Sequence, residues 1–292
     1  MADGSHPAAI HHVMGSDDPK RPEVGNRPPQ AAETGQTSGG RAERVEGLHF
    51  WAAMLKVELH AHTEEDPADA IPHSTARLID HAAGLGYGAL AVTLHDRYFD
   101  PAPWQSYASH QHVLLLSGIE RTIQGQHVLL INFPPAVAHV TRFEELAHLK
   151  AATSGLVVAP HPFYPTFSAL GRTLDVHADI IDAVEINAMY TRWLNFNRRA
   201  ERWARAHRKP LVGNTDLHVL DQMGTTYSLV DAPPDADAIC DAIRAGRVEV
   251  RSAPLSSLRA GWLFGRMLAG GMRGRALRWT GRRRREEDDH QA

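Results

Sequence analysis

Short apolar runs alternate along the chain with segments whose apolar residues recur at helical spacing. Seven runs have the length and composition of β-strands, and they span residues 54–59, 89–94, 112–119, 127–133, 156–160, 182–187 and 210–214. Amphipathic patterns typical of helices separate most of these runs, and the clearest span residues 74–86, 142–155, 192–208 and 235–246. Strands joined mostly through helices predict a parallel α/β architecture. The third and fourth runs are too close for a helix, so "RTIQGQ" between them predicts a hairpin. We expect a closed or nearly closed barrel of about seven strands.

The two ends of the chain differ from this central pattern. Residues 1–46 are rich in Pro, Gly, Ala, Gln and charge and contain almost no large apolar side chains. Such a segment buries too little surface to offset the entropy lost on ordering, so we expect it to be disordered. The barrel is expected to span residues 54–252. We expect residues 253–292 to form a basic amphipathic, partly disordered tail, whose residues 253–285 suit weak contact with an anionic membrane surface or a partner. The alternative is a weak helix folded over the barrel.

The composition is that of a globular protein of a reducing compartment. The apolar share of 43% and the net charge of -3 suit a globular protein without strong overall attraction to nucleic acid. The single cysteine, Cys240, excludes an internal disulfide and makes a reducing cytoplasm the expected location; its helical surroundings predict a small buried residue. We find no apolar run of about 18 residues and no signal-peptide pattern. The unusual number is 19 histidines.

Histidines and carboxylates recur where the predicted strands end. Five strands are followed by such residues, which are His60 and His62, His95 and Asp96, Glu120, His161, and Asp216 and His218. In parallel α/β barrels the carboxyl ends of all strands meet at one face, where active sites are built. His127 begins the fourth strand, and a hairpin would bring it to the same face.

Imidazole and carboxylate ligands suit Zn²⁺, Mn²⁺ and Fe²⁺. The candidates are too numerous for one four-coordinate zinc, so we expect two or three divalent metal ions with a carboxylate bridging a pair. Taken singly, these residues also have simpler structural interpretations. "APHP" could be a proline-fixed turn, Glu120 could pair with Arg121, and Asp216 could cap the next segment. Only their convergence on one face favours the metal site.

Several motifs together resemble the polymerase and histidinol phosphatase (PHP) family. They are "ELHAHT", "TLHD", "GIE", "HVLLINF", "APHP", "AVEINA" and "NTDLH", and they occur in order over about residues 55–250. The resemblance implies a distorted (β/α)7 TIM-like barrel that holds up to three metal ions, and phosphoesterase activity.

The resemblance also implies a set of ligands. One metal would be bound by His60, His62, Glu120 and Asp216. A second would share Glu120 and add His127 and His161. A third would be bound by His95, His218 and a residue of the loop after His62. In that loop "TEEDPAD" departs from the family pattern, and we choose Asp66, with Glu65 and His73 as rivals.

The leading functional hypothesis is hydrolysis of a phosphate ester, a small phosphomonoester or a nucleotide, by a metal-activated hydroxide. Glu120, Asp216 and His218 are the predicted catalytic residues, and Asp96 is another candidate acid. Arg97 and Arg192 are candidates for binding the phosphate. Glu185 could line the site or pair with an arginine.

Three alternatives stay open at this point. They are an exonuclease-type phosphodiesterase acting on nucleic acid, a metal-binding regulatory module without catalysis, and an amide hydrolase on a similar barrel. The last is disfavoured because no lysine follows a predicted strand.

Overall fold

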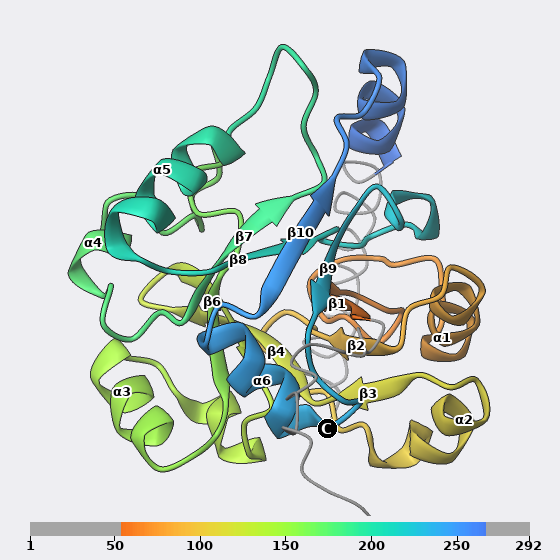
Figure 1. Ribbon diagram of the computed structural model, residues 1–292, viewed down its shortest axis with the longest axis horizontal. Helices are drawn as coiled ribbons and strands as arrows, with labels where there is room; N and C mark the ends of the chain where they lie inside the picture. Colours follow the sequence, from red (N-terminus) through yellow and green to blue (C-terminus); the bar gives the residue numbers. More distant parts are fainter. Residues whose placement is uncertain (1–53, 267–292) are drawn as a thin grey trace, which may run out of the picture. The chain divides into compact units, whose positions relative to one another are not determined.

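The computed structural model describes residues 54–266. Ten strands form two five-stranded sheets (Figure 1). In spatial order the first sheet contains β10 (Val248–Ser252), β9 (Thr226–Val230), β1 (Leu55–Ala61), β2 (Ala89–Val92) and β3 (Leu114–Leu116). The second contains β4 (Gly118–Ile123), β5 (Gln126–Ile131), β6 (Leu156–Ala159), β7 (Ala183–Asn187) and β8 (Leu211–Asn214).

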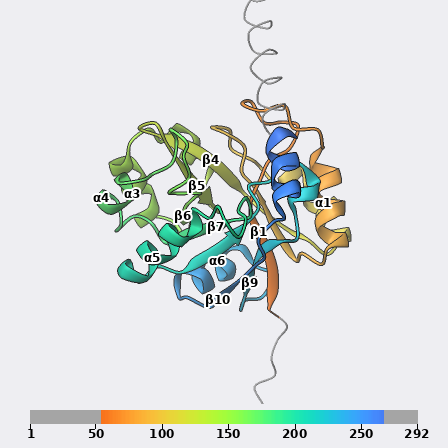
Figure 2. The same ribbon diagram turned by 90° about the horizontal axis from the view of Figure 1, so that it is seen from above.

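The helices lie around the two sheets (Figures 1 and 2). They are α1 (Thr75–Gly84), α2 (Gln105–His110), α3 (Phe143–Ala151), α4 (Thr173–Val176), α5 (Asn197–His207) and α6 (Ala236–Arg244), with 3-10 turns at Ala102–Trp104, Pro135–His139 and Leu220–Gln222. Residues 257–266 are also helical. Ser74 caps α1, since its hydroxyl accepts a hydrogen bond from the Arg77 amide. None of the helices in the described part of the chain is long and apolar enough to cross a membrane.

The α/β class and the predicted hairpin are confirmed, but the sheets are mixed and not parallel throughout, since β1–β9, β9–β10 and β5–β6 also pair in antiparallel fashion. β4 and β5 pair in antiparallel fashion across Gln124 and Gly125, whose φ angles are 49° and 82°. Two consecutive positive φ angles are those of a type I′ turn, which matches the twist of a hairpin. Cys240 is buried, and burial raises the pKa of its thiol to about 12.

The structure differs in two respects from the predicted closed or nearly closed barrel of about seven strands. Over residues 54–266 the sheets do not join into one closed hydrogen-bonded barrel, and ten strands replace seven. The third predicted strand divides at Ser117 into β3 and β4, which belong to different sheets. β9 and β10 were not predicted. In β9 two of the three buried positions are Thr226 and Ser228, so its buried face lacks the apolar pattern of a strand.

Two glycines let the sheets approach each other where ladder pairing stops. At the contact of β8 with β9, a Cβ on Gly213 would lie 2.8 Å from the Tyr227 carbonyl oxygen. There the Ser228 hydroxyl accepts from the Gly213 amide at 2.9 Å and donates to its carbonyl at 3.2 Å. At the contact of β2 with β4, a Cβ on Gly118 would lie 2.6 Å from the Val92 carbonyl oxygen. We call these two contacts the seams.

The core has inner and outer parts. The inner cluster combines side chains from both sheets, such as Val57 and Val158, with Ile239 and Ile243 of α6. Two outer clusters pack the helices onto the sheets, one with α3 and α5 on the second sheet and one with α1 and α2 on the first. Side chains of α6 therefore fill one end of the interior between the sheets, and polar residues occupy the other end.

Candidate metal centre

An irregularity in β1 aims the first two histidines. Val57 and Leu59 belong to the inner cluster but Ala61 belongs to an outer one, and the register of β1 with β2 shifts between Glu58 and Ala61. Strict alternation would leave His60 on the face opposite Leu59. The shift brings His60 to the interior, where it contacts Glu120. Bulges of this kind re-aim side chains next to active sites.

The carboxylate of Glu120 lies at the middle of the site. It comes from β4 and is almost fully buried. Five imidazole nitrogens lie near it. They are His60 Nε2 at 3.4 Å, His62 Nε2 at 3.4 Å and His95 Nε2 at 3.1 Å from Oε2, with His127 Nδ1 at 2.7 Å and His161 Nε2 at 3.2 Å from Oε1. The two oxygens of one carboxylate therefore face two groups of histidines, as a bridging ligand would.

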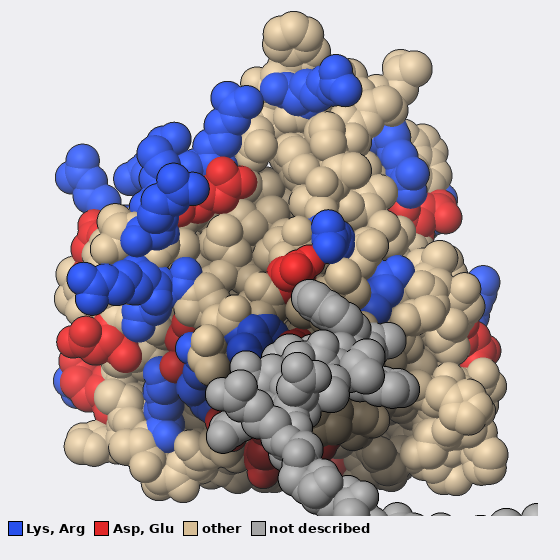
Figure 3. Space-filling model, in the orientation of Figure 1, with Lys and Arg blue, Asp and Glu red and all other residues tan. Residues whose placement is uncertain are grey.

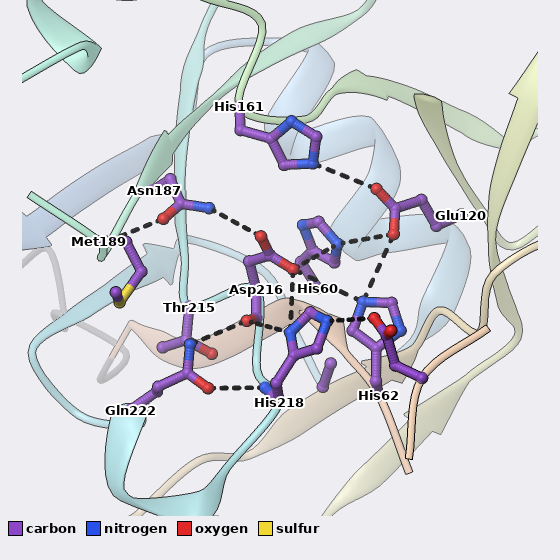
Figure 4. A network of polar contacts seen from close by, with 12 residues as sticks. His60, His62, Glu120, His161, Asn187, Met189, Thr215, Asp216, His218 and Gln222 are labelled. Carbon is purple, nitrogen blue, oxygen red and sulfur yellow. Dashed lines mark hydrogen bonds and ion pairs between the residues drawn. The ribbon is translucent and has the colours of Figure 1, made fainter. Parts of the chain in front are cut away.

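Asp216, just after β8, completes this arrangement from the other side (Figure 4). Its Oδ1 lies 3.3 Å from His60 Nε2, 3.6 Å from His62 Nε2 and 3.5 Å from His218 Nδ1. Its Oδ2 accepts a hydrogen bond from Asn187 Nδ2 at 3.4 Å. All the predicted metal ligands thus belong to one connected set of contacts.

Carboxylates behind the histidines fix the orientation of the rings. Glu185 Oε2 lies 2.8 Å from His60 Nδ1, and Asp66 Oδ2 lies 2.9 Å from both His62 Nδ1 and His95 Nδ1. A carboxylate that accepts from one ring nitrogen directs the other nitrogen toward a metal. Glu185 therefore lines the site, one of the two roles considered for it, and it pairs with no arginine of residues 54–266.

Asp66 and Asp69 both contact histidines of the site, whereas only Asp66 was predicted there: Asp66 lies beside His62 and His95, and Asp69 beside His218. Asp66 Oδ1 accepts from the Ala68 and Asp69 amides, which closes a tight turn. The turn brings Asp69 Oδ2 to 3.2 Å from His218 Nε2. Asp69 is a site residue that the sequence analysis missed, although an acid three residues after Asp66 was the available signal.

The rivals Glu65 and His73 have other contacts. Glu65 accepts from the Thr63 and Thr75 hydroxyls. His73 donates from Nε2 to the His62 carbonyl oxygen, and burial lowers its pKa to about 4. Asp96 accepts from Arg121 and Thr122 and is not among the residues that line the cavity described below.

Electrostatics favour a cation in the centre. Burial opposes charge on Glu120 and Asp216, but the surrounding histidines hold the pKa of each carboxyl well below its usual value. Burial likewise disfavours the imidazolium of His95, yet Glu120 and Asp66 raise its pKa to about 9. The buried carboxylates require positive charge, which either protonated imidazoles or divalent cations can supply.

The residues fit a metal centre by an independent criterion. Among the described residues, His60 Nε2 and His62 Nε2 are buried ring nitrogens without a hydrogen-bond partner. Buried polar atoms are almost always paired, so two such nitrogens that face the same two carboxylates suit the binding of a metal ion. Four groups of three residues have ligand atoms within 4.8 Å of one another. They are His60–Glu120–His161, His60–His62–Asp216, His62–Asp66–His95 and His95–Glu120–His127.

Backbone strain also gathers at the site. Asp96, His161 and Asp216 follow β2, β6 and β8 with φ angles of 52°, 29° and 51°. Positive φ is uncommon outside glycine and clusters at functional sites. The sequence gives no signal of this conformation.

A cavity of about 500 Å³ opens over the centre. His95, Glu120, His127, His161, Asp216 and His218 line it on one side. The arginines expected to bind phosphate do not line it. Arg97 donates to the Glu65 carbonyl oxygen, and Arg192 lines a separate hollow with Trp193 and Leu255. On the face shown in Figure 3, lysines and arginines gather at the upper left, where α5 lies in Figure 1.

The fold is similar to that of PHP-like proteins, and the histidine-carboxylate cluster could hold metal ions. Residues 195–248, which run from α5 into β10 and include Asp216 and His218, match the family model described as PHP-associated. This match, together with the structural neighbours below, confirms the resemblance predicted from the sequence. No curated protein matches the chain.

Two solved structures are similar in fold. One is a two-domain protein from Bacteroides vulgatus that contains a predicted PHP-like metal-dependent phosphoesterase, with 18% identity and a TM-score of 0.53. The match covers 68% of this chain and 65% of that one, less than two thirds of the Bacteroides protein. The other is PsfC from Pseudomonas syringae, with 17% identity, a TM-score of 0.52, and 77% and 99% coverage. At these identities the likeness concerns the fold.

Proposed function

We propose that the protein is a metal-dependent phosphoesterase that hydrolyses a phosphate ester at a centre of two or three divalent ions. The observation that carries this proposal is the set of five imidazole nitrogens around the two oxygens of Glu120. A single buried carboxylate shared in this way suits a bridge between ions. The nitrogen and oxygen donors, without thiolate, suit Mn, Fe or Zn.

The ions would be held at three places. The first would use Nε2 of His60 and His62 with Glu120 and Asp216; the second, Glu120 with His127 and His161; and the third, His95 and His218 with Asp69 in place of Asp66. When bound, such ions activate water as a nucleophile and neutralise the phosphoryl oxygens.

The chain itself orients these groups. Glu185 and Asp66 hold the histidine rings by their Nδ1 atoms, and Asn187 holds Asp216 Oδ2. Glu120, Asp216 and His218 all line the cavity and stay our candidates for contact with the reacting phosphoryl group. Arg97 and Arg192 are not retained, because neither reaches the cavity.

Replacement of Glu120 by Gln tests the proposal. The amide preserves the shape but removes the charge that would bridge two ions, so metal content should fall. Hydrolysis of a phosphomonoester panel with added Mn²⁺ should fall by roughly 100-fold or more, because replacing even a residue that hydrogen-bonds to a metal ligand lowers metal affinity or activity by about 10–100-fold. Elemental analysis of the purified protein and release of inorganic phosphate are the measurements.

The matched control is Glu144→Gln on the exposed face of α3, which should change neither quantity. Wild-type protein that binds no metal on titration would overturn the proposal. Cleavage of oligonucleotides but not of monoesters would favour the phosphodiesterase alternative, and metal binding without any turnover would favour the regulatory module.

A further inference from the structure

The cavity over the centre has two chemically different sides. One side consists of the histidines and acids described above. The other consists largely of apolar and aromatic side chains, which are Tyr164, Pro165, Met189, Leu194, Phe196 and Phe264. None of the described residues that line the cavity is Lys or Arg. A negatively charged group other than one held at the centre would therefore find no cationic partner there.

Three segments far apart in sequence build the apolar wall. Tyr164 and Pro165 follow β6, Met189 to Phe196 follow β7, and Phe264 comes from the helix at residues 257–266. That helix is fixed in place by Leu263, which is fully buried in a cluster with Val219 and Leu255. Arg259 Nη2 also donates to the Asp221 carbonyl oxygen at 2.6 Å. Phe264 is thus carried by an anchored element and belongs to the site.

The wall continues to the surface. Leu194 is 60% exposed and Phe264 is 57% exposed, although both line the cavity. Exposed large apolar residues beside a cavity are typical of ligand-binding surfaces. Two of the four neutral polar residues that line the cavity are already engaged, since Tyr164 donates to the Met189 carbonyl oxygen and Asn187 Nδ2 donates to Glu185 and Asp216; Thr166 and Ser168 are the other two. A sugar or nucleotide with many hydroxyl groups would meet few free partners here.

We propose that the substrate is a phosphate monoester of an uncharged, apolar alcohol, whose hydrocarbon part lies against this wall. The inference rests on the proposed phosphoesterase function and names its substrate class. The phosphoryl group is held by the metal centre, without an arginine or lysine of the cavity. Phe264 and Leu194 are specificity-determining residues because they supply apolar area at the open end.

A matched pair of esters tests the substrate class. Hexyl phosphate and glycerol 1-phosphate both release a primary alcohol, so their intrinsic reactivities are close, and they differ mainly in apolar area. Each methylene that is buried against the wall should raise kcat/KM by roughly fourfold. We expect the hexyl ester to have the higher kcat/KM by about tenfold or more. Equal or reversed values would overturn the inference while leaving phosphoesterase function intact.

Substitutions in the apolar wall test whether it causes the preference for the hexyl ester. Phe264→Asp should lower kcat/KM for hexyl phosphate by about tenfold more than it lowers that for glycerol 1-phosphate, because the new carboxylate repels both phosphates alike but removes apolar contact only from the hexyl chain. Leu258→Asp is the control, because Leu258 lies on the same helix and is 89% exposed but does not line the cavity. An equal loss on both esters in Phe264→Asp would contradict a specificity role for this residue.

A binding measurement separates this inference from the proposed function. Calorimetric titration of the full chain with 4-butylphenol, which has no phosphate, reports on the wall without hydrolysis. Binding should be at least roughly fivefold weaker in Phe264→Asp than in the wild type or Leu258→Asp. If neither ester is cleaved but this pattern of binding holds, the proposed function fails and the apolar site stands. Equal binding by all three proteins overturns the apolar site.

Discussion

At the scale of single residues, Glu58 is the side chain that makes the irregularity of β1 possible. Where β1 leaves its ladder, the Leu59 amide donates to Asn214 Oδ1 and the His60 amide donates to Glu58 Oε1. Glu58 also accepts from the amide and hydroxyl of Thr215. These bonds replace the missing strand pairing, because buried amides must be paired. His60 therefore owes its inward direction to a residue that contacts no candidate metal position.

Replacement of Glu58 by Ala should leave three buried donors unpaired. At about 1 kcal/mol each, the free energy of unfolding should fall by about 3 kcal/mol. Glu58→Gln keeps an acceptor for the amides and should lose less. Urea unfolding of the two variants beside the wild type measures the difference. Loss of equal size in both variants would contradict the role given to these hydrogen bonds.

The same residue gives a dependence on pH. Burial raises the pKa of Glu58 to about 8, against the opposing effect of its hydrogen bonds with Thr215 and His60. A carboxyl with a raised pKa contributes its full stability below the unfolded pKa of about 4.5, and this contribution is lost as the pH rises to about 8. Glu58→Gln does not titrate, so its stability relative to the wild type should improve between pH 5 and pH 8.

Most residues of the cluster could be predicted from the sequence, because side-chain type and position after a strand are visible there. His60, His62, His95, Glu120, His127, His161, Asp216 and His218 all lie in the cluster. The sequence could not place Asp69, whose approach to His218 depends on a turn closed by Asp66. It also favoured Arg97 and Arg192, since closeness in sequence to a strand end does not determine where a long side chain points.

At the scale of elements, strands with apolar runs could be predicted and their grouping into sheets could not. The seven predicted runs all contain strands, because burial on both faces makes them continuously apolar. Sheet membership depends on close approaches that involve single glycines. Gly213 and Gly118 each lie at a seam, and nothing in their local sequence distinguishes them from glycines in turns.

Gly213→Ala should therefore be costly although alanine is otherwise a mild replacement. The added Cβ would lie 2.8 Å from the Tyr227 carbonyl oxygen and 2.9 Å from Val250 Cγ1, so β8 must move away from β9 and β10. Overpacking of this kind lowers the free energy of unfolding by about 1–3 kcal/mol. Gly84→Ala at the end of α1 is the control, because nothing lies within 4 Å and helix propensity favours alanine. Thermal unfolding of both variants measures the contrast, and equal melting temperatures would contradict it.

At the scale of the whole described unit, the candidate centre lies where the two sheets meet. His60, His62 and His95 come from the first sheet or the loops after its strands. Glu120 and His127 come from the second sheet, and His161, Asp216 and His218 from the loops after its strands. Short backbone links join the sheets near the centre, in which Leu217 bonds to His60 and His62, and Glu120 bonds to Leu94 and Asp96. Ions bound by both groups would cross-link the sheets where strand pairing is weakest.

Removal of metal should therefore weaken the backbone links between the two sheets before it weakens the pairing within either sheet. A ligand that binds only the folded state stabilises it by mass action, and here the effect should concentrate on the amides that span the bound groups. On chelation, hydrogen exchange at the amides of His62, Asp96, Glu120 and Leu217 should accelerate by about tenfold or more, while the amides in the middle of β5 change little. Mass-spectrometric exchange with and without chelator measures this. In Glu120→Gln, which should already lack the bridging ion, the chelator should have little effect. A uniform acceleration across both sheets in the wild type would mean that the ions stabilise the fold as a whole and do not fasten its two halves together.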